Sequence, residues 1–372
     1  MKLRLPNLLE INLSLSFLFL LSCNTTPTNN LDSEEKASNS IQLYGNTQGT
    51  TYSIICNDSI DITHQEVDEI LHQFDLALST YIEESTISQL NTMGGGQFSY
   101  SDKFNYFNRC YKETSYIYEK TNGLFDPTIF PLIDSWGFYN KNHQVPDSTV
   151  IDSLNRYVGF SRNHFNYLYG LDSLNQRVPK NIIIKNTPQA KLDFNGIAQG
   201  LAVDILAEFL ETKGAINYFV EIGGEIRVSG KNAENVNWRI GIDKPIENSD
   251  ANNREIMDII HLTNTSVATS GSYRNFFESE GKSYSHTIDP KTGYPVMHKL
   301  ISATVVTEKC SYADALATAC MVMGPDETIN YFENDTIFNA GIYLIYENNK
   351  GRILTYYNQK FAEYFDEETF TN

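Results

Sequence analysis

The chain has 372 residues, of which 41% are apolar and 20% are charged, so it can bury a sizeable core and is not a disordered protein. Its net charge of −18 opposes the phosphates of DNA and RNA, and this argues against a nucleic-acid-binding function. A pyrophosphate substrate would need local help from a cation or from aimed backbone N–H groups.

The first 22 residues have the pattern of an export signal. Lys2 and Arg4 precede an apolar run at 11–21, which is too short to span a bilayer as a mature helix. The ending Leu20-Leu21-Ser22-Cys23 resembles the lipobox of bacterial lipoproteins, which implies cleavage before Cys23 and lipidation of its thiol. The alternative is a strand or helix of the core. Lipidation would anchor the protein to a membrane without spanning it.

Residues 23–40 follow this segment and contain almost no apolar side chain after Cys23, so we expect a flexible tether there. The sequence predicts one folded domain over 41–372. Two short strands come first, at 41–44 and 51–56. Thr63 and Glu66 form a capping box that predicts the start of a helix.

Helices and strands alternate along the rest of the chain, which predicts a mixed α and β fold. A second helix is expected from Asp102 to Thr121, and the polar segment 140–180 is expected to be irregular. Further helices are predicted at 197–213 and 312–323. Further strands are predicted at 182–185, 218–222, 238–242, 258–262, 301–307, 343–346 and 353–357.

Five cysteines are scattered along the chain without a C-x-x-C or Cys/His cluster, which argues against a structural zinc site. Four of them lie in apolar segments, where free cysteine behaves as a small hydrophobic side chain. The sequence therefore predicts four buried thiols, and it leaves open a disulfide among them. These four are Cys56, Cys110, Cys310 and Cys320.

Residues 192–204 lie where a strand should pass into a helix. Gly196 would let the backbone approach a ligand, and the helix N-terminus would then face an anion. Asp193 can either cap this turn or accept a hydrogen bond from a ligand. Asp204 falls inside the helix and is expected to be structural. Further on, Gly223-Gly224 at a strand end permits a sharp reversal or close packing.

Two later stretches carry side chains suited to catalysis. His286 precedes the turn signature Asp289-Pro290, where a neutral imidazole could act as a general base or could be a hydrogen-bonded structural group. Asp314 and Thr318 are four apart on one helix face, and their oxygens could ligate a hard cation such as Mg²⁺. The alternative for Asp314 is a favourable contact with the helix dipole.

Several blocks in the same order resemble the ApbE family of FAD:protein FMN transferases over roughly residues 41–345. The resemblance implies a single large catalytic domain related to the T-fold. Blocks in family order are far more specific than any single glycine motif. They are Gly49-Thr50-Thr51-Tyr52, Ser79-Thr80-Tyr81, Gly123-Leu124-Phe125-Asp126-Pro127-Thr128, Asp193 to Asp204, Gly223-Gly224-Glu225, Ala268-Thr269-Ser270-Gly271, His286 to Gly293, and Asp314 to Thr318.

The resemblance also implies roles at matching positions. His286 would be the catalytic base. Mg²⁺ would be held by the side chains of Asp314 and Thr318 and by the main-chain oxygen of Gly196. Two positions depart from the family pattern, which has Met at Gln48 and Lys at Gln199. The FAD would contact Gln48, Tyr81, Leu124, Phe125, Asp126, Asp193, Gln199 and Ile288.

The implied reaction is attack by a Thr or Ser hydroxyl of a target protein on the FMN-side phosphorus of FAD, with release of AMP. The implied partners are exported Thr-bearing domains of flavin-dependent electron-transfer complexes. A lipid anchor in the cell envelope, with the domain in the periplasm, would keep enzyme and target on one surface. Two alternatives stay open, namely hydrolysis of FAD to FMN and AMP, and flavin binding without catalysis.

Overall fold

A computed structural model describes residues 40–139, 142–160, 164–171, 173–174, 176–245, 255–272, 276–279 and 282–365. The predicted signal peptide, the lipidation site Cys23 and all of the tether except Ser40 lie outside these ranges and stay predictions. Among the helices in the described ranges, none combines the length and apolar character needed to cross a bilayer.

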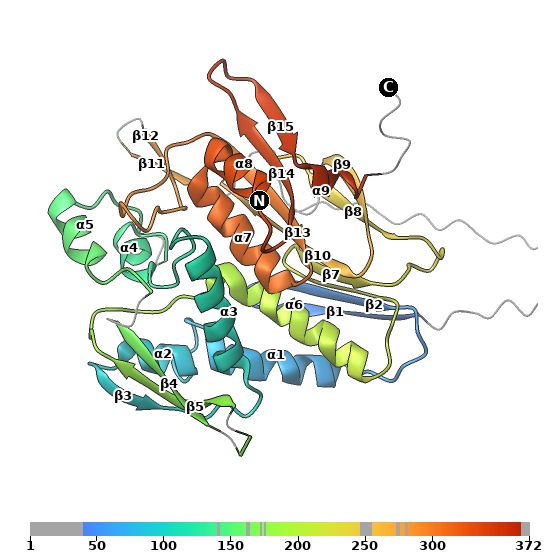
Figure 1. Cartoon of the computed structure of the whole chain (residues 1–372), viewed down its shortest axis with the longest axis horizontal. Helices are drawn as coiled ribbons and strands as arrows, with labels where there is room; N and C mark the ends of the chain where they lie inside the picture. The colour runs from blue at the N-terminus through green and yellow to red at the C-terminus, as the bar shows by residue number, and fades with distance from the viewer. Residues whose placement is uncertain are drawn as a thin grey trace, which may run out of the picture. The chain divides into compact units, whose positions relative to one another are not determined.

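An eight-stranded antiparallel sheet forms the centre of the fold (Figure 1). Its order places β2 against β6, which follows it by more than 150 residues, so the sheet joins distant parts of the chain. In spatial order the strands are β1 (Ile41–Thr47), β2 (Thr50–Cys56), β6 (Tyr218–Ile222), β7 (Glu225–Ser229), β10 (Thr265–Gly271), β13 (Leu300–Thr307), β14 (Gly341–Glu347) and β15 (Ile353–Tyr357).

Both faces of this sheet are covered, because successive side chains of a strand point to opposite sides. Leu344 packs into the large core under the helices, whereas Ile345 packs into a second apolar cluster on the other face. Helices α6 (Asn195–Thr212) and α7 (Cys310–Met323) lie side by side over the first face (Figure 1). The second cluster is closed by β8 (Trp238–Asp243), β9 (Ile256–Leu262) and α9 (Gln359–Ala362).

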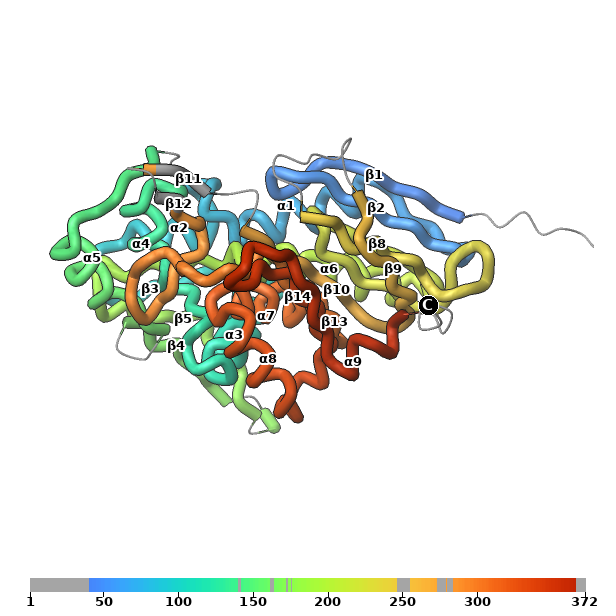
Figure 2. The backbone as a smooth tube through the Cα atoms, turned by 90° about the horizontal axis from the view of Figure 1, so that it is seen from above, coloured from blue at the N-terminus to red at the C-terminus, as the bar shows by residue number. Residues whose placement is uncertain are grey.

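The remaining elements lie beyond α6 and α7 or beside them. Figure 2 shows α4 and α5 at the end of the fold opposite to β8 and β9. A three-stranded sheet packs with the early helices. These elements are α1 (His64–Leu78), α2 (Thr86–Thr92), β3 (Gly96–Ser99), α3 (Tyr106–Lys120), α4 (Phe130–Ser135), α5 (Ser148–Asn155), β4 (Phe165–Leu171), β5 (Arg177–Lys185), β11 (Phe276–Ser279), β12 (Lys282–Ser285) and α8 (Pro325–Glu333).

Local capping explains where the first long helices begin. The capping box at Thr63 and Glu66 is present and starts α1 at the predicted place. The prediction that the second helix begins at Asp102 is wrong by four residues. The Asp102 carboxylate instead accepts hydrogen bonds from the backbone N–H groups of Phe107 and Asn108, so it caps α3 from outside the helix.

The prediction of an irregular segment at 140–180 is also wrong, because it contains α5, β4 and the start of β5. Asp147 caps α5 by accepting from the N–H of Thr149. Strand β4 is fixed by pairing with β5, which is a tertiary effect that local composition does not reveal. The mixed α and β class and the four buried free thiols are confirmed.

Candidate active site

The first turn of α6 meets α7 at two glycines. A Cβ atom on Gly200 would lie 2.4 Å from the carbonyl oxygen of Cys310, so only glycine permits this contact. A Cβ atom on Gly196 would lie 3.1 Å from Thr318 Oγ1 and 3.1 Å from the Phe125 ring. The N-terminal turn of α6 therefore presents bare backbone to the side chains of α7.

Two aspartates hold α6 and α7 together reciprocally. Asp314 Oδ2 on α7 accepts a hydrogen bond of 3.1 Å from the N–H of Gly200 on α6. Asp204 on α6 accepts bonds of 3.0 Å from the N–H groups of Cys310 and Ser311, which open α7. The predicted structural role of Asp204 is thereby explained, since it caps the helix that carries Asp314 and Thr318.

Glu225 also lies at this site, although it was not predicted as a site residue from the sequence. It begins β7 directly after the Gly223-Gly224 turn and is only 7% exposed. Its Oε2 atom is buried, and none of the described residues forms a hydrogen bond with it. A Cβ atom on Gly223 would lie 3.1 Å from Gln199 Nε2 and 3.3 Å from Glu225 Oε2, so the amide and the carboxylate face the same turn.

The carboxyl groups of Asp314 and Glu225 both have raised pKa values. Burial raises the pKa of Asp314 to about 7, against the opposing effect of the Gly200 N–H. Burial also raises the pKa of Glu225 well above its usual value, and the Asp314 carboxylate raises it further. Two buried carboxylates that lie close together need either a bound cation or a proton to neutralise their charge.

A second group of side chains lies N-terminal to α6. Asp193 is 8% exposed, and its Oδ1 atom accepts a bond of 2.8 Å from the N–H of Asn195. Its own N–H donates to the carbonyl of Pro127 at 2.6 Å, which ties it to the loop after α3. Burial raises the pKa of Asp193 to about 6. Asp193 thus caps the turn while lying next to residues expected to bind a nucleotide.

Aromatic side chains border this group. The ring of Tyr81 is 71% exposed and stacks on Tyr139 with 5.3 Å between the ring centroids. The pKa of Tyr81 is raised by partial burial of its hydroxyl and by the Asp193 carboxylate. One face of an aromatic ring is therefore open close to a buried acid, which suits a flat heterocycle with a polar edge.

The sequence model of the ApbE family matches residues 48–340 of this chain.

The chain belongs to the ApbE family.

Relatives in the ApbE family resemble it over most of their length. The FAD:protein FMN transferase of Haemophilus influenzae is 34% identical over 327 residues, which are 85% of this chain and 89% of the relative. The one from Vibrio cholerae is 35% identical over 311 residues, with coverage of 82% and 87%. The structure of the flavin transferase ApbE from Vibrio cholerae superposes with a TM-score of 0.73 at 31% identity, covering 88% of this chain and 99% of that chain.

The structure brings together most residues that the ApbE resemblance implies. Gly196, Thr318 and Phe125 are in contact, and Asp314 contacts the next turn of α6. Leu124 and Phe125 are buried after α3. The neighbouring Asp126 accepts from the N–H and hydroxyl of Thr128, and burial raises the pKa of Asp126 to about 6.

Gln48 lies in the turn between β1 and β2, with a left-handed φ of 50°. Its buried amide lies close to the Asp75 carboxylate without meeting hydrogen-bond geometry. Thr50 from the same turn contacts the Gly223 position, where a Cβ atom would lie 3.0 Å from Thr50 Cγ2. The β1–β2 turn therefore faces the same hairpin that carries Glu225.

His286 and Ile288 lie on the segment after β12. The His286 ring meets Phe138 edge to face at 6.5 Å, and Phe138 is next to Tyr139, the stacking partner of Tyr81. The side chain of Ile288 is 5% exposed and belongs to a small apolar cluster with Trp136. The predicted contact of Ile288 with a nucleotide would therefore have to use its backbone.

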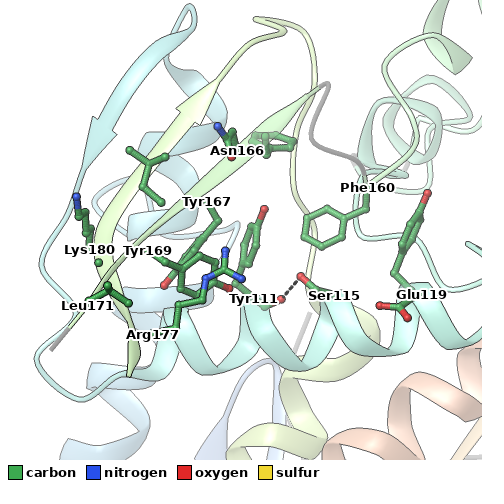
Figure 3. Close-up of a pocket in the computed structure, with 14 residues that line it drawn as sticks. Tyr111, Ser115, Glu119, Phe160, Asn166, Tyr167, Tyr169, Leu171, Arg177 and Lys180 are labelled. Atoms are coloured by element: carbon green, nitrogen blue, oxygen red, sulfur yellow. Dashed lines mark hydrogen bonds between the residues drawn. The ribbon is translucent and has the colours of Figure 1, made fainter. Parts of the chain in front are cut away.

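A large cavity lies away from these residues. It measures about 1180 Å³ and opens between α3 and the strands β4 and β5 (Figure 3). Tyr111, Arg177 and Lys180 line it, and it contains none of the predicted site residues. A smaller cavity of about 340 Å³ borders α1 and the β1–β2 turn at Asp75, close to Gln48. Size alone thus does not identify the active site of this ApbE protein.

Proposed function

We propose that the chain transfers FMN from FAD to a Thr or Ser hydroxyl of a target protein, releasing AMP. Membership of the ApbE family supports this reaction class, since relatives named FAD:protein FMN transferase match over more than four fifths of their length. One observation carries the proposal at the level of the site. The bare N-terminal part of α6 faces the buried carboxylates of Asp314 and Glu225, and within the described residues Glu225 Oε2 has no hydrogen-bond partner.

The residues present fit a hard divalent cation such as Mg²⁺. Asp314 and Thr318 supply side-chain oxygens one helical turn apart, and Gly196 has no Cβ to shield its backbone from Thr318. The buried Glu225 Oε2 atom, which has no hydrogen-bond partner among the described residues, supports a cation at this place. When bound, Mg²⁺ would neutralise the pyrophosphate and the charge that develops on the leaving phosphate.

The protein's own groups would position the reactants. N–H groups at the start of α6 would point at the pyrophosphate. Tyr81 would stack on a ring of FAD, and Asp193 would accept from the nucleotide. The target hydroxyl forms a bond to the FMN-side phosphorus while the bond from that phosphorus to the AMP oxygen breaks. The hydroxyl proton passes to a ring nitrogen of His286, which acts as general base.

The two departures from the family pattern affect charge and shape. Gln199 brings an amide donor where the family has a lysine, so this chain has one positive charge less beside the phosphates. We expect the reaction to depend more strongly on the divalent cation as a result. Gln48 replaces a methionine, and its amide can hydrogen-bond to FAD where a thioether would only pack.

The decisive experiment is mass spectrometry of a co-expressed, exported, Thr-bearing acceptor domain. We expect the acceptor to gain the mass of covalent FMN with the wild-type chain. With Asp314→Ala we expect at least a ~100-fold loss of transfer, because a ligand oxygen for the cation is removed. Circular dichroism serves as the control that this variant remains folded. Full transfer by Asp314→Ala would contradict the assignment of the cation site.

The same preparation separates the two alternatives. Incubation with FAD and Mg²⁺ in the absence of an acceptor would release AMP rapidly if the protein were a hydrolase. Binding of FAD without AMP release in the presence or absence of acceptor would indicate a flavin carrier. The proposed transferase releases AMP at a substantial rate only when the acceptor is present.

We infer that the protein is anchored in the bacterial cell envelope through a lipid on Cys23, with its folded domain in the periplasm. The apolar segment at 11–21 followed by Leu20-Leu21-Ser22-Cys23 supports this. Cell fractionation tests it, since Cys23→Ser should move the protein from the membrane fraction to the soluble one. Membrane association that persists in Cys23→Ser would refute the anchor.

A further inference from the structure

We propose that Glu225 is a further ligand of the cation site, so that the cation is held by carboxylates from two different elements, α7 and the β6–β7 hairpin. This inference rests on the proposed function, because it assigns one more residue to the same site. It commits to a hard divalent cation, because the proposed ligands, Gly196, Glu225, Asp314 and Thr318, would all bind through oxygen atoms.

The backbone leaves Glu225 little freedom to point elsewhere. Gly223 and Gly224 form the two-residue turn of the β6–β7 hairpin with φ values of 63° and 112°, which side-chain-bearing residues rarely adopt. Glu225 is paired with Ile222 across this turn, which fixes its register. Its side chain is thereby directed toward α6 and α7, where it is 93% buried.

Contacts with α6 place Glu225 near Asp314. Glu225 Oε2 and Gln199 Nε2 both face the Gly223 position, so the carboxylate reaches the N-terminal part of α6. Asp314 Oδ2 accepts from the N–H of Gly200, the residue after Gln199. Glu225 and Asp314 therefore border one common space beside the start of α7.

A buried carboxylate without a partner destabilises the folded protein, so its presence requires an explanation. Burying a charged group without a partner costs several kcal/mol, so native proteins pair such groups or bind a cation to them. In the part of the chain that the structure describes, Glu225 Oε2 has no hydrogen-bond partner. A glutamine of the same shape would avoid this cost, and the sequence nevertheless has an acid. A cation that binds both carboxylates supplies the missing partner.

The test measures cation binding directly on the full-length chain. Mn²⁺ is the probe because it favours the same oxygen ligands as Mg²⁺ and its free form is counted by electron paramagnetic resonance. We expect Glu225→Gln to weaken Mn²⁺ binding at least ~10-fold, with and without FAD. Glu221→Gln is the matched control, since this acid lies on the same hairpin and accepts instead from the Gly224 N–H. It should bind Mn²⁺ as the wild type does.

Thermal melting gives a second signature that a merely structural glutamate would not produce. Without metal, Glu225→Gln should melt at a higher temperature than the wild type, because one of two like buried charges is removed. With saturating Mg²⁺ the order should reverse, because the wild type gains more from the ion. Glu225→Asp keeps the charge but withdraws it by one methylene, and it should show intermediate Mn²⁺ affinity.

Each outcome either supports or overturns the role of Glu225 as a ligand. Unchanged Mn²⁺ affinity in Glu225→Gln, or a variant that melts lower than the wild type both with and without Mg²⁺, overturns the role of Glu225. If Glu225→Gln does not fold, Mn²⁺ affinity equal to the wild type in Glu225→Asp overturns it instead.

Flavin transfer by the wild type is measured in parallel. If the wild type transfers FMN while Glu225→Gln binds Mn²⁺ normally, only this inference fails. A wild type that neither binds Mn²⁺ nor transfers FMN overturns the proposed function as well.

Discussion

Single residues at the α6–α7 contact determine whether the site can exist. Gly200 was not recognisable as important from the sequence, because its role depends on how closely another helix approaches. The sequence did indicate Gly196, Asp314 and Thr318, since glycine at a helix start and oxygens one turn apart are local patterns. Glu225 was missed as a ligand because its meaning depends on the packing of a distant hairpin.

We predict that Gly200→Ala loosens this contact. The added Cβ would lie 2.4 Å from the Cys310 carbonyl and 2.9 Å from Asp314 Cβ, so the helices must separate. The free energy of unfolding in urea should fall by about 1–3 kcal/mol, and FAD affinity should fall with it. The control is Gly94→Ala, where an added Cβ meets nothing within 4 Å. A Gly200→Ala protein as stable as the wild type would refute the close contact.

We also predict a pH-dependent gain in stability from Asp193→Asn. Burial raises the folded pKa of Asp193 from 3.8 to about 6, so the folded state keeps a proton that the unfolded state releases. Stability is therefore lost as pH rises from about 4 to about 6. Removing the charge should add about 3 kcal/mol at pH 8 and about half of that at pH 5, measured by urea unfolding.

The control variant, Asp147→Asn, should change stability in the opposite direction from Asp193→Asn. The exposed Asp147 carboxylate has a lowered pKa, because it accepts from the hydroxyl and N–H of Thr149. Asp147→Asn should therefore reduce stability at high pH rather than raise it. A gain in Asp193→Asn that is the same at both pH values would mean that packing, and not charge, is responsible. FAD affinity should fall in Asp193→Asn if this residue contacts the nucleotide.

At the scale of elements, capping decides where the helices begin. The capping box of α1 is local and could be predicted, whereas Asp102 caps α3 from five and six residues away and misled the prediction of its start. Asp204 begins α7 from another helix altogether, so α7 starts at Cys310 and not at Tyr312 as predicted. Strands fixed by partners rather than by composition, such as β4, could not be found from the sequence.

We predict that Asp204→Asn destabilises α7 and the site together. The fully buried carboxylate caps α7 and accepts from Arg227 Nη1 at 2.9 Å, so the amide would leave the guanidinium with only its more exposed partners, Glu211 and Glu208. Unfolding free energy should fall by about 3 kcal/mol, and Mn²⁺ affinity should fall because Asp314 shifts. The control is Glu208→Gln, a more exposed partner of Arg109, which should cost less than about 1 kcal/mol. Equal effects of the two variants would contradict the capping role.

At the scale of the whole molecule, most of the apolar core lies outside the proposed cation ligands. The eight-stranded sheet is packed on both faces by apolar side chains, and the carboxylates lie at one end of the α6–α7 pair. The strands predicted at 343–346 and 353–357 are confirmed, and they pair with each other as β14 and β15. The order of the strands, in contrast, follows from long-range pairing and was not predicted.

Metal removal should consequently abolish function without unfolding the protein. After treatment with EDTA we expect unchanged far-ultraviolet circular dichroism but no flavin transfer, restored on adding Mg²⁺. FAD and Mg²⁺ together should raise the melting temperature more than the sum of their separate effects, because each supplies the charge that the other needs. Additive effects would indicate that the two ligands bind independently.

The residues of the site come from positions between 48 and 318, and α7 is the last of the long helices to be synthesised. A growing or translocating chain that ends before Cys310 contains the β1–β2 and β6–β7 hairpins but lacks two of the acidic and hydroxyl oxygens. Such a chain lacks oxygens that we propose as ligands of the cation. Contacts over this sequence distance form slowly compared with local helices, so we expect FAD to bind only after α7 has been made.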